Sequence, residues 1–132
     1  MDPVSDERGQ ALLVAVLALA IAAAAVIGLR AAQERIVVAA RAQRAGEAAV
    51  EAAAQAVADR YSVHAGVARE LVTDPLVLEA ARIAAEELAR VNGASGIEQV
   101  QLVCAGNRIE ARLVLNGYSH RAGFSAPECS PS

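Results

Sequence analysis

The first third of the chain contains a long run without charged side chains. Residues 11–29 carry none, and the nearest charges are on Arg8 and Arg30. As a helix these nineteen residues would span roughly 28 Å, close to the hydrocarbon thickness of a bilayer. We therefore predict a charged leader over residues 1–9 and a transmembrane helix over residues 10–30. The residues expected to anchor it are its large aliphatic ones: Leu12, Leu13, Val14, Val16, Leu17, Leu19, Ile21, Val26, Ile27 and Leu29.

Two other interpretations of this run stay open. A cleaved secretory signal should begin with a basic segment, but residues 1–8 hold three acids against Arg8, and the run is longer than a usual signal core of about 7–15 residues. The alanines at 22–25 would nevertheless suit a signal cleavage site. A core helix of a soluble bundle would need a solvated face, and no polar residue interrupts residues 11–29 to make one. A permanent anchor is the preferred interpretation.

Residues 31–61 continue as an Ala-rich helical extension. This segment has no proline, and Gly46 is its only strong helix breaker. Charged residues at spacings of three and four, such as Arg44 and Glu47, would pair along one face. The segment is either a solvated helix with some coiled-coil character or a helix whose alanine seam packs closely against another copy or a partner. The sequence does not separate the two.

A second helix is predicted to begin at Pro75. Asp74 is suited to the N-cap position and Pro75 to the first helical position, while Asn92 and Gly93 end the segment. A short helical piece is expected before it, over residues 67–72. Apolar residues recur at spacings of three and four, so we predict a buried face made of Leu76, Ala80, Ile83, Ala84, Leu88 and Val91. The charged residues Glu79, Arg82, Glu86 and Arg90 are expected on the opposite side.

The period of the pattern then changes to two. Val100, Leu102 and Cys104 alternate with more polar residues, and the same alternation continues from Ile109 to Leu115. The turn residues 105–107 separate the two runs, so we predict an antiparallel hairpin with one apolar face covered by the helix from Pro75. The chain is thus expected to be α+β, with a helix-plus-hairpin domain over residues 62–116 and an irregular tail over residues 117–132.

The two cysteines allow a single bridge within one chain. Cys104 lies on the predicted inward face of the first strand, and Cys129 lies in the tail. A disulfide between them would hold a tail that has little else to fix it, and would indicate an oxidising compartment. Two free thiols are the alternative, although an exposed free thiol in a loose tail is unfavourable.

Composition excludes several functions. Alanine makes up a quarter of the chain and tryptophan is absent, so deep apolar pockets are not expected. The net charge is −3, which gives no electrostatic basis for nucleic-acid binding. His64 and His120 stand apart from any cluster with metal-ligand spacing, and no serine lies in a nucleophile-elbow pattern. We expect no enzyme activity, cofactor, metal or small-molecule substrate.

Several segments resemble TadE/TadG-like proteins, the minor pilin-like components of Flp (Tad) pilus systems. The resemblance starts at ERGQAL before the apolar helix, extends through AARAQRAGEAAVEAAAQA and EAARIAAEELARVNGAS, and reaches the strand pair QVQLVCAGNRIEARLVL. It implies a pilin-like fold, partners that are other pilus subunits contacted through the Ala-rich helix, and leader cleavage between Gly9 and Gln10. Processed members of that family usually carry Glu at the fifth mature position, where this chain has Val14. That difference suits a cap, an initiating subunit or a permanent membrane component better than a repeating shaft subunit.

The resulting prediction is a single-pass protein of the inner (cytoplasmic) membrane that takes part in pilus or related secretion-system assembly. Four arginines follow the apolar run within residues 30–44, which by the positive-inside rule would keep the C-terminal domain in the cytoplasm. The disulfide would instead require the outside, and we favour the outside, either at the membrane or within a surface filament. The alternative function is a generic single-pass envelope protein that presents a small interaction domain.

Overall fold

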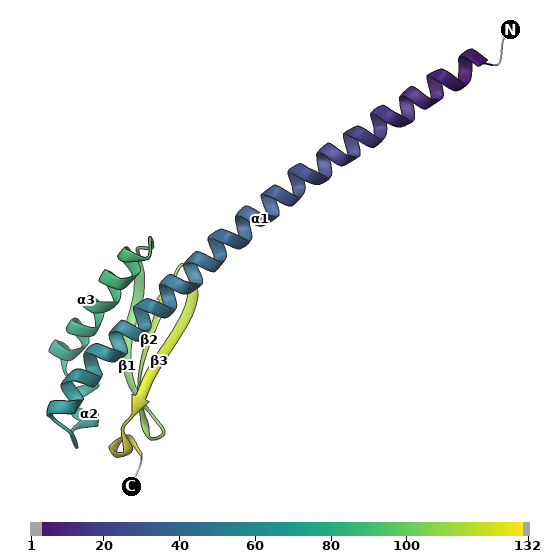
Figure 1. Ribbon diagram of the computed structural model, residues 1–132. Helices are drawn as coiled ribbons and strands as arrows, with labels where there is room; N and C mark the ends of the chain where they lie inside the picture. The colour runs from purple at the N-terminus through teal and green to yellow at the C-terminus, as the bar shows by residue number, and fades with distance from the viewer. Residues whose placement is uncertain (1–3, 131–132) are drawn as a thin grey trace. The chain divides into compact units, whose positions relative to one another are not determined.

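The computed structural model describes residues 4–130, with side chains from residue 9 onward. Met1–Pro3 of the predicted leader and the last two residues of the predicted tail lie outside this range. The chain is α+β, as predicted, and combines a long helix, further helices and a small antiparallel sheet (Figure 1). The elements are α1 (Val4–Val63), α2 (Ala68–Leu71), α3 (Pro75–Val91), β1 (Ile97–Ala105), β2 (Arg108–Leu115), β3 (Tyr118–Ser125) and the 3-10 turn η1 (Pro127–Cys129).

The chain divides into two units, Met1–Val38 and Ala39–Ser132, and the second is called the head below. The described part of the first unit is helix alone. The boundary between the units lies within the predicted Ala-rich extension, and residues 39–61 of that extension belong to the head. Ala45, Ala49, Ala53 and Val57 recur at intervals of four and are fully buried. The alanine seam of the extension is therefore covered from residue 45 onward by the head itself.

Helix α3 starts as the sequence predicts, but its buried face is a different one. The Asp74 carboxylate accepts a hydrogen bond from the Leu76 backbone N–H at 2.8 Å, and Pro75 is the first helical residue. Of the predicted core residues, Ala80, Ala84 and Leu88 are half-buried, whereas Leu76, Ile83 and Val91 are 72%, 55% and 66% exposed. The buried residues are Val77, Ala81, Ala85 and Ala89. The helix packs through its row of small residues, which permits a closer approach than the larger Leu and Ile side chains would.

The sheet has three antiparallel strands in the order β1-β2-β3. The predicted hairpin is present as β1 and β2, joined at Gly106 and Asn107. The predicted irregular tail is wrong, because residues 118–125 form β3 and pair with the whole of β2. The turn before β3 is made by Asn116 and Gly117, with φ angles of +52° and +79°. Positive φ at both central residues is the type I′ hairpin turn that Asn-Gly favours.

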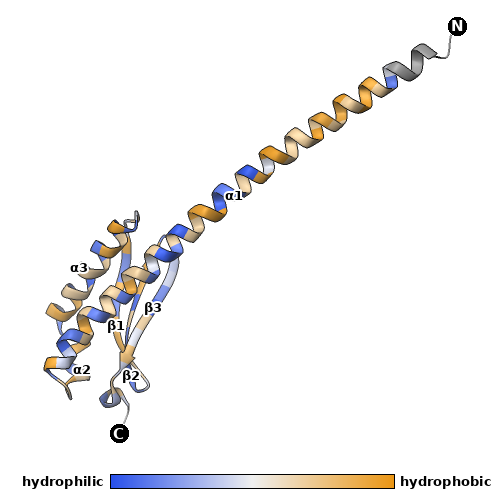
Figure 2. Cartoon of the chain, viewed as in Figure 1, coloured by the Kyte–Doolittle hydropathy of each residue, from blue (hydrophilic) through white to orange (hydrophobic). Residues whose placement is uncertain are grey.

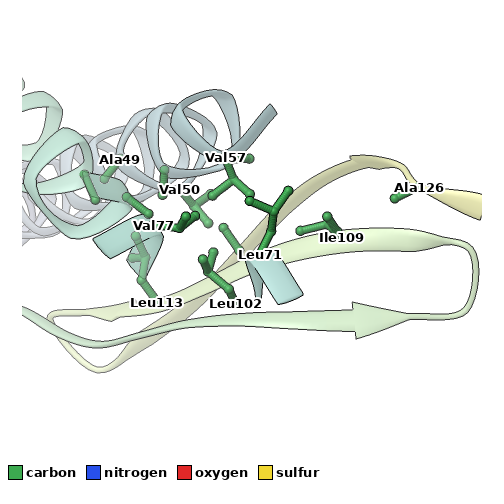
Figure 3. Packing of buried hydrophobic residues seen from close by; sticks show 14 of the residues in the cluster. Ala49, Val50, Val57, Leu71, Val77, Leu102, Ile109, Leu113 and Ala126 are labelled. Atoms are coloured by element: carbon green, nitrogen blue, oxygen red, sulfur yellow. The ribbon is translucent and has the colours of Figure 1, made fainter. Parts of the chain in front are cut away.

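The core lies between the helices and one face of the sheet. Figure 3 shows Val50 and Val57 of α1 and Val77 of α3 above Leu102, Ile109 and Leu113 of the strands. Its largest fully buried side chains are Ile109, Leu113, Leu115 and Val57, and most of the rest are alanines. Because alanine buries little area, this core is thin, and covalent and polar contacts carry more of the head's stability than in a protein with a larger core.

Candidate functional sites in the apolar helix and the head

The candidate membrane span, residues 10–30, lies within the first unit. All ten predicted anchor residues lie in α1, with exposed fractions from 54% at Val26 to 75% at Leu19. In Figure 2 the part of α1 that follows the grey N-terminal residues is coloured mainly hydrophobic. By length and composition, one helix among the described residues is apolar enough to cross a membrane, with a mean hydropathy of 2.9 over its most apolar window. Such a helix, apolar all round, is stable in lipid or among other helices and not in water.

The predicted processing site lies inside the same helix. Gly9 and Gln10 are both exposed, and α1 begins at Val4, before the Gly9–Gln10 peptide bond. A Cβ added at Gly9 would meet nothing within 4 Å, so no close packing explains the glycine. Cleavage at this bond stays a prediction.

The two cysteines form the predicted disulfide. Cys104 in β1 and Cys129 in η1 are bonded, with their Cα atoms 5.2 Å apart. Cys129 is 6% exposed. The bond therefore closes the end of the chain onto the first strand of the sheet.

Polar contacts hold the same C-terminal segment, and no local sequence pattern predicts them. The Tyr61 hydroxyl at the end of α1 donates a hydrogen bond to the Glu128 carboxylate at 2.6 Å. The Arg69 guanidinium of α2 donates to the backbone carbonyls of Glu128 at 3.3 Å and Ser130 at 2.8 Å. The Tyr61 ring also lies 5.5 Å from the Phe124 ring, centroid to centroid. The C-terminal segment is thus held to α1, α2 and β1 together.

The Tyr61 contact shifts both pKa values. The hydrogen bond from Tyr61 lowers the pKa of Glu128, and the same bond is the main reason that the pKa of Tyr61 is raised. The lowered pKa of Glu128 means that this contact stabilises the folded state at pH values above the ordinary carboxyl pKa. The stabilisation is lost as the pH falls through the lowered pKa. The raised pKa of Tyr61 means that the contact also stabilises the folded state at pH values below the ordinary tyrosine pKa. That stabilisation is lost as the pH rises through the raised pKa. The contact therefore persists across neutral pH.

A histidine and a glycine meet where β3 passes α1. His120 is buried, with 7% of its surface exposed, and its Nε2 atom has no hydrogen-bond partner among the described residues. A Cβ built on Gly46 would lie 2.1 Å from that atom, far inside contact distance. Glycine within a helix costs about 1 kcal/mol relative to alanine, so its presence at 46 is explained by the space that His120 needs. His64, in contrast, is exposed in the loop after α1.

We expect Gly46→Ala to destabilise the head although alanine is the better helix former. The forced displacement of His120 costs about 1–3 kcal/mol, against a gain of about 1 kcal/mol in helix propensity. In a His120→Ala background the same Gly46→Ala change should instead stabilise the head, by about 1 kcal/mol. Thermal unfolding of the full chain in detergent, followed by circular dichroism, measures both effects.

Gly28→Ala is the matched control, because a Cβ at Gly28 meets nothing within 4 Å. It should leave the unfolding of the head unchanged. If Gly46→Ala were equally harmless, or equally harmful with and without His120, the proposed contact would be wrong.

The described residues contain no group of three or more His, Cys, Asp or Glu side chains placed to hold a metal ion. No family model matches the chain, and no curated protein or solved structure matches it. The resemblance to TadE/TadG-like proteins therefore rests on the pattern of residues alone.

Proposed function

We propose that the chain is a membrane-anchored structural protein whose α1 helix crosses the bilayer through residues 10–30. The observation that carries this proposal is the exposure of all ten large aliphatic side chains of that segment, each more than half exposed. Together they favour insertion by about 3–6 kcal/mol. The charged residues nearest to the segment, Arg8 and Arg30, bracket it at both ends.

The head is proposed to lie outside the cytoplasm. The bond between Cys104 and Cys129 supports this side, because disulfides persist in oxidising compartments and are rare in the cytosol. The four arginines within residues 30–44 favour the opposite side. They lie on one helix and are mixed there with Glu34, which weakens the argument from their charge.

Within this frame we propose a pilin-like role in Flp (Tad) pilus or related secretion-system assembly. An apolar N-terminal helix and a small head suit a subunit whose helix lies first in lipid and later among other helices in a filament. Ala45, Ala49 and Ala53 are covered by the head, so contact with other subunits through this alanine seam would be restricted to residues 31–44. Val14 at the fifth position after Gly9 favours an anchoring or terminal subunit over a repeating one.

The alternative is a single-pass envelope protein outside any pilus. Val14 also favours this function, since the acidic residue usual in processed pilin-like chains is missing. In both cases the apolar helix lies first in the membrane.

Shearing of intact cells that make the protein tests whether the chain is part of a filament. If the chain belongs to a filament, part of it should appear in the sheared surface fraction, and should co-sediment there with filaments at high speed. A protein of the membrane alone would remain wholly with the cells. Complete retention, in cells shown by electron microscopy to bear filaments, would contradict a place in the filament and leave an anchoring role at its base or the alternative function.

A further inference from the structure

The outer face of the sheet, away from the core, is basic. Arg108, Arg112 and Arg121 lie on this face against Glu98 and Glu110. Arg112 and Arg121 stand directly opposite each other on β2 and β3. Arg112 pairs with Glu110 at 2.9 Å, whereas Arg121 has no ion-pair partner among the side chains described from residue 9 to residue 130. Like charges directly opposite each other destabilise a sheet. An anionic partner bound to this arginine pair would relieve the repulsion.

A hollow surrounds the arginine pair. Gln99, Gln101 and Ser119 line it together with Arg112 and Arg121. Gln99 has a φ of +53° within β1, where the pairing with β2 shifts register. A positive φ at a non-glycine strand residue is strained, and bulges of this kind re-aim side chains at binding surfaces. The bulge thus brings an additional side-chain amide to the hollow beside the guanidinium groups.

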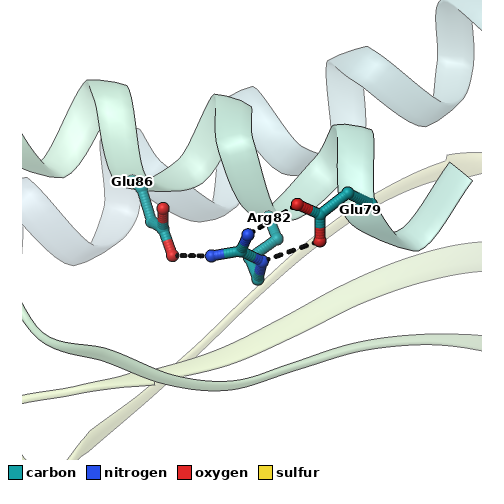
Figure 4. A network of polar contacts seen from close by, with 3 residues as sticks. All are labelled: Glu79, Arg82 and Glu86. Atoms are coloured by element: carbon teal, nitrogen blue, oxygen red, sulfur yellow. Dashed lines mark hydrogen bonds and ion pairs between the residues drawn. The ribbon is translucent and has the colours of Figure 1, made fainter. Parts of the chain in front are cut away.

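The exposed face of α3 has the complementary character. Leu76 and Ile83 are seven residues apart and form an apolar row on this face. Glu79 and Glu86 form a second, acidic row, in which each glutamate follows a residue of the apolar row by three positions. Figure 4 shows Arg82 between the two glutamates, bonded to both. One arginine between two carboxylates leaves an excess negative charge. The exposed apolar row and the acidic row therefore run side by side along the helix.

The two surfaces also agree in length. A helix of 17 residues is about 25 Å long, and strands of 8 or 9 residues extend about 26–30 Å. The outer face of the sheet carries the partly buried Val103 and Val114, which offer apolar contact to the Leu76 and Ile83 row. A second α3 would lie on the outer face of the sheet as the chain's own helices lie on the inner face.

We propose that the outer sheet face of one copy binds the exposed face of α3 of a second copy, with the Arg112–Arg121 pair facing the Glu79–Glu86 pair. Each copy would use different surfaces for its two neighbours, so the contact is heterologous and repeats as an open row. One helix on a small sheet makes a contact below the size of a stable dimer interface. The contact therefore depends on the proposed membrane anchoring, which raises the effective concentration of neighbouring heads.

Photo-crosslinking of the full chain in membranes tests this contact. Benzoylphenylalanine replaces Ser119, an exposed residue opposite Val114 on the outer face. Ultraviolet light should produce a ladder of crosslinked copies, and mass spectrometry after trypsin digestion should place the crosslinks within residues 70–90. A single band without a ladder, or crosslinks to other segments, would overturn the proposal.

Charge reversal tests the polar part of the contact. Arg112→Glu with Arg121→Glu should lower the crosslink yield about tenfold, and Glu79→Arg with Glu86→Arg should do the same.

Co-expression of the two variants should restore the ladder, because each acidic sheet then meets a basic helix. Restoration cannot come from misfolded heads. Arg60→Glu, which reverses an exposed arginine on α1 outside both surfaces, is the control and should leave the yield unchanged. Formation of the disulfide, seen on non-reducing gels, checks the fold of each variant.

The contact would be contradicted if co-expression did not restore the ladder although the heads had formed their disulfide. It would also be contradicted if the α1 control lost as much crosslink yield as the charge-reversal variants. The proposed function has separate outcomes. Crosslinked rows in cells whose sheared fraction lacks the chain would support the contact without a place in a filament. Filaments that contain the chain, with crosslinks elsewhere, would retain the function and remove the contact.

Discussion

Two arginines at the middle of the span should release the chain from the membrane. In the variant Leu17→Arg with Ile21→Arg, each arginine costs about 2.5–3.5 kcal/mol at the centre of a transmembrane helix, and each replaced residue removes a favourable contribution of about 0.3–0.6 kcal/mol. The total penalty is about 6–8 kcal/mol, which exceeds the roughly 3–6 kcal/mol that all ten aliphatic residues supply. The fraction of newly made protein that floats with membranes in a density gradient should fall to the background level.

The matched control places the same substitutions in the same helix but outside the span. Ile36 and Val38 are 68% and 65% exposed, and Ile36→Arg with Val38→Arg should leave flotation unchanged. A Leu17→Arg, Ile21→Arg variant that still floats with membranes would show that residues 10–30 do not form the anchor.

Removal of the disulfide should have the second-largest effect. The bond joins residues 25 positions apart, and a loop of that size reduces the entropy of the unfolded chain by an amount worth about 3.5 kcal/mol. Small domains have total stabilities of about 5–15 kcal/mol, so Cys104→Ala with Cys129→Ala removes a large share. For a head of this size the melting temperature should fall by about 15–25 °C. Circular dichroism of the full chain in detergent measures it.

Reduction of the unmodified chain provides the control. A thiol reductant should lower the melting temperature of the native protein by a similar amount and should not affect the Cys104→Ala, Cys129→Ala variant. A melting temperature within 3 °C of the native one in the double variant would show that the Tyr61–Glu128 and Arg69 contacts suffice to hold the C-terminal segment.

Features of the fold that depend on local chemistry were predictable from the sequence. The N-cap at Asp74, the proline after it, the β1–β2 hairpin and the pairing of Cys104 with Cys129 are as predicted. The cap, the proline and the hairpin each depend on a few residues that are close together in the chain. The disulfide was predictable because two cysteines allow a single pairing.

Strand β3 was missed for a physical reason that the sequence does contain. Its inward positions are His120, Ala122 and Phe124, a polar, a small and a large residue, so no apolar alternation marks it. The usable signal was Asn116-Gly117, which directly follows β2 and is a strong two-residue hairpin turn. Hairpin chemistry was the better guide here than hydrophobic period.

The buried face of α3 and the Gly46–His120 contact depend on tertiary packing. The helix offers two apolar rows, one of larger residues and one of alanines, and hydrophobicity alone favours the larger row. The close approach of the helix to the sheet selects the alanines instead. Gly46 was visible as an isolated glycine in a helical pattern, which can mark a close contact, but its partner His120 lies 74 positions away, and no local pattern connects the two.

The most direct test of the account is the sedimentation of the unmodified full-length chain with cell envelopes after an alkaline carbonate wash. A protein anchored by residues 10–30 should remain in the envelope pellet through this wash and leave it only with detergent. Recovery of the intact chain, with its N-terminal segment retained, in the supernatant without detergent would contradict the anchor and the functions proposed from it.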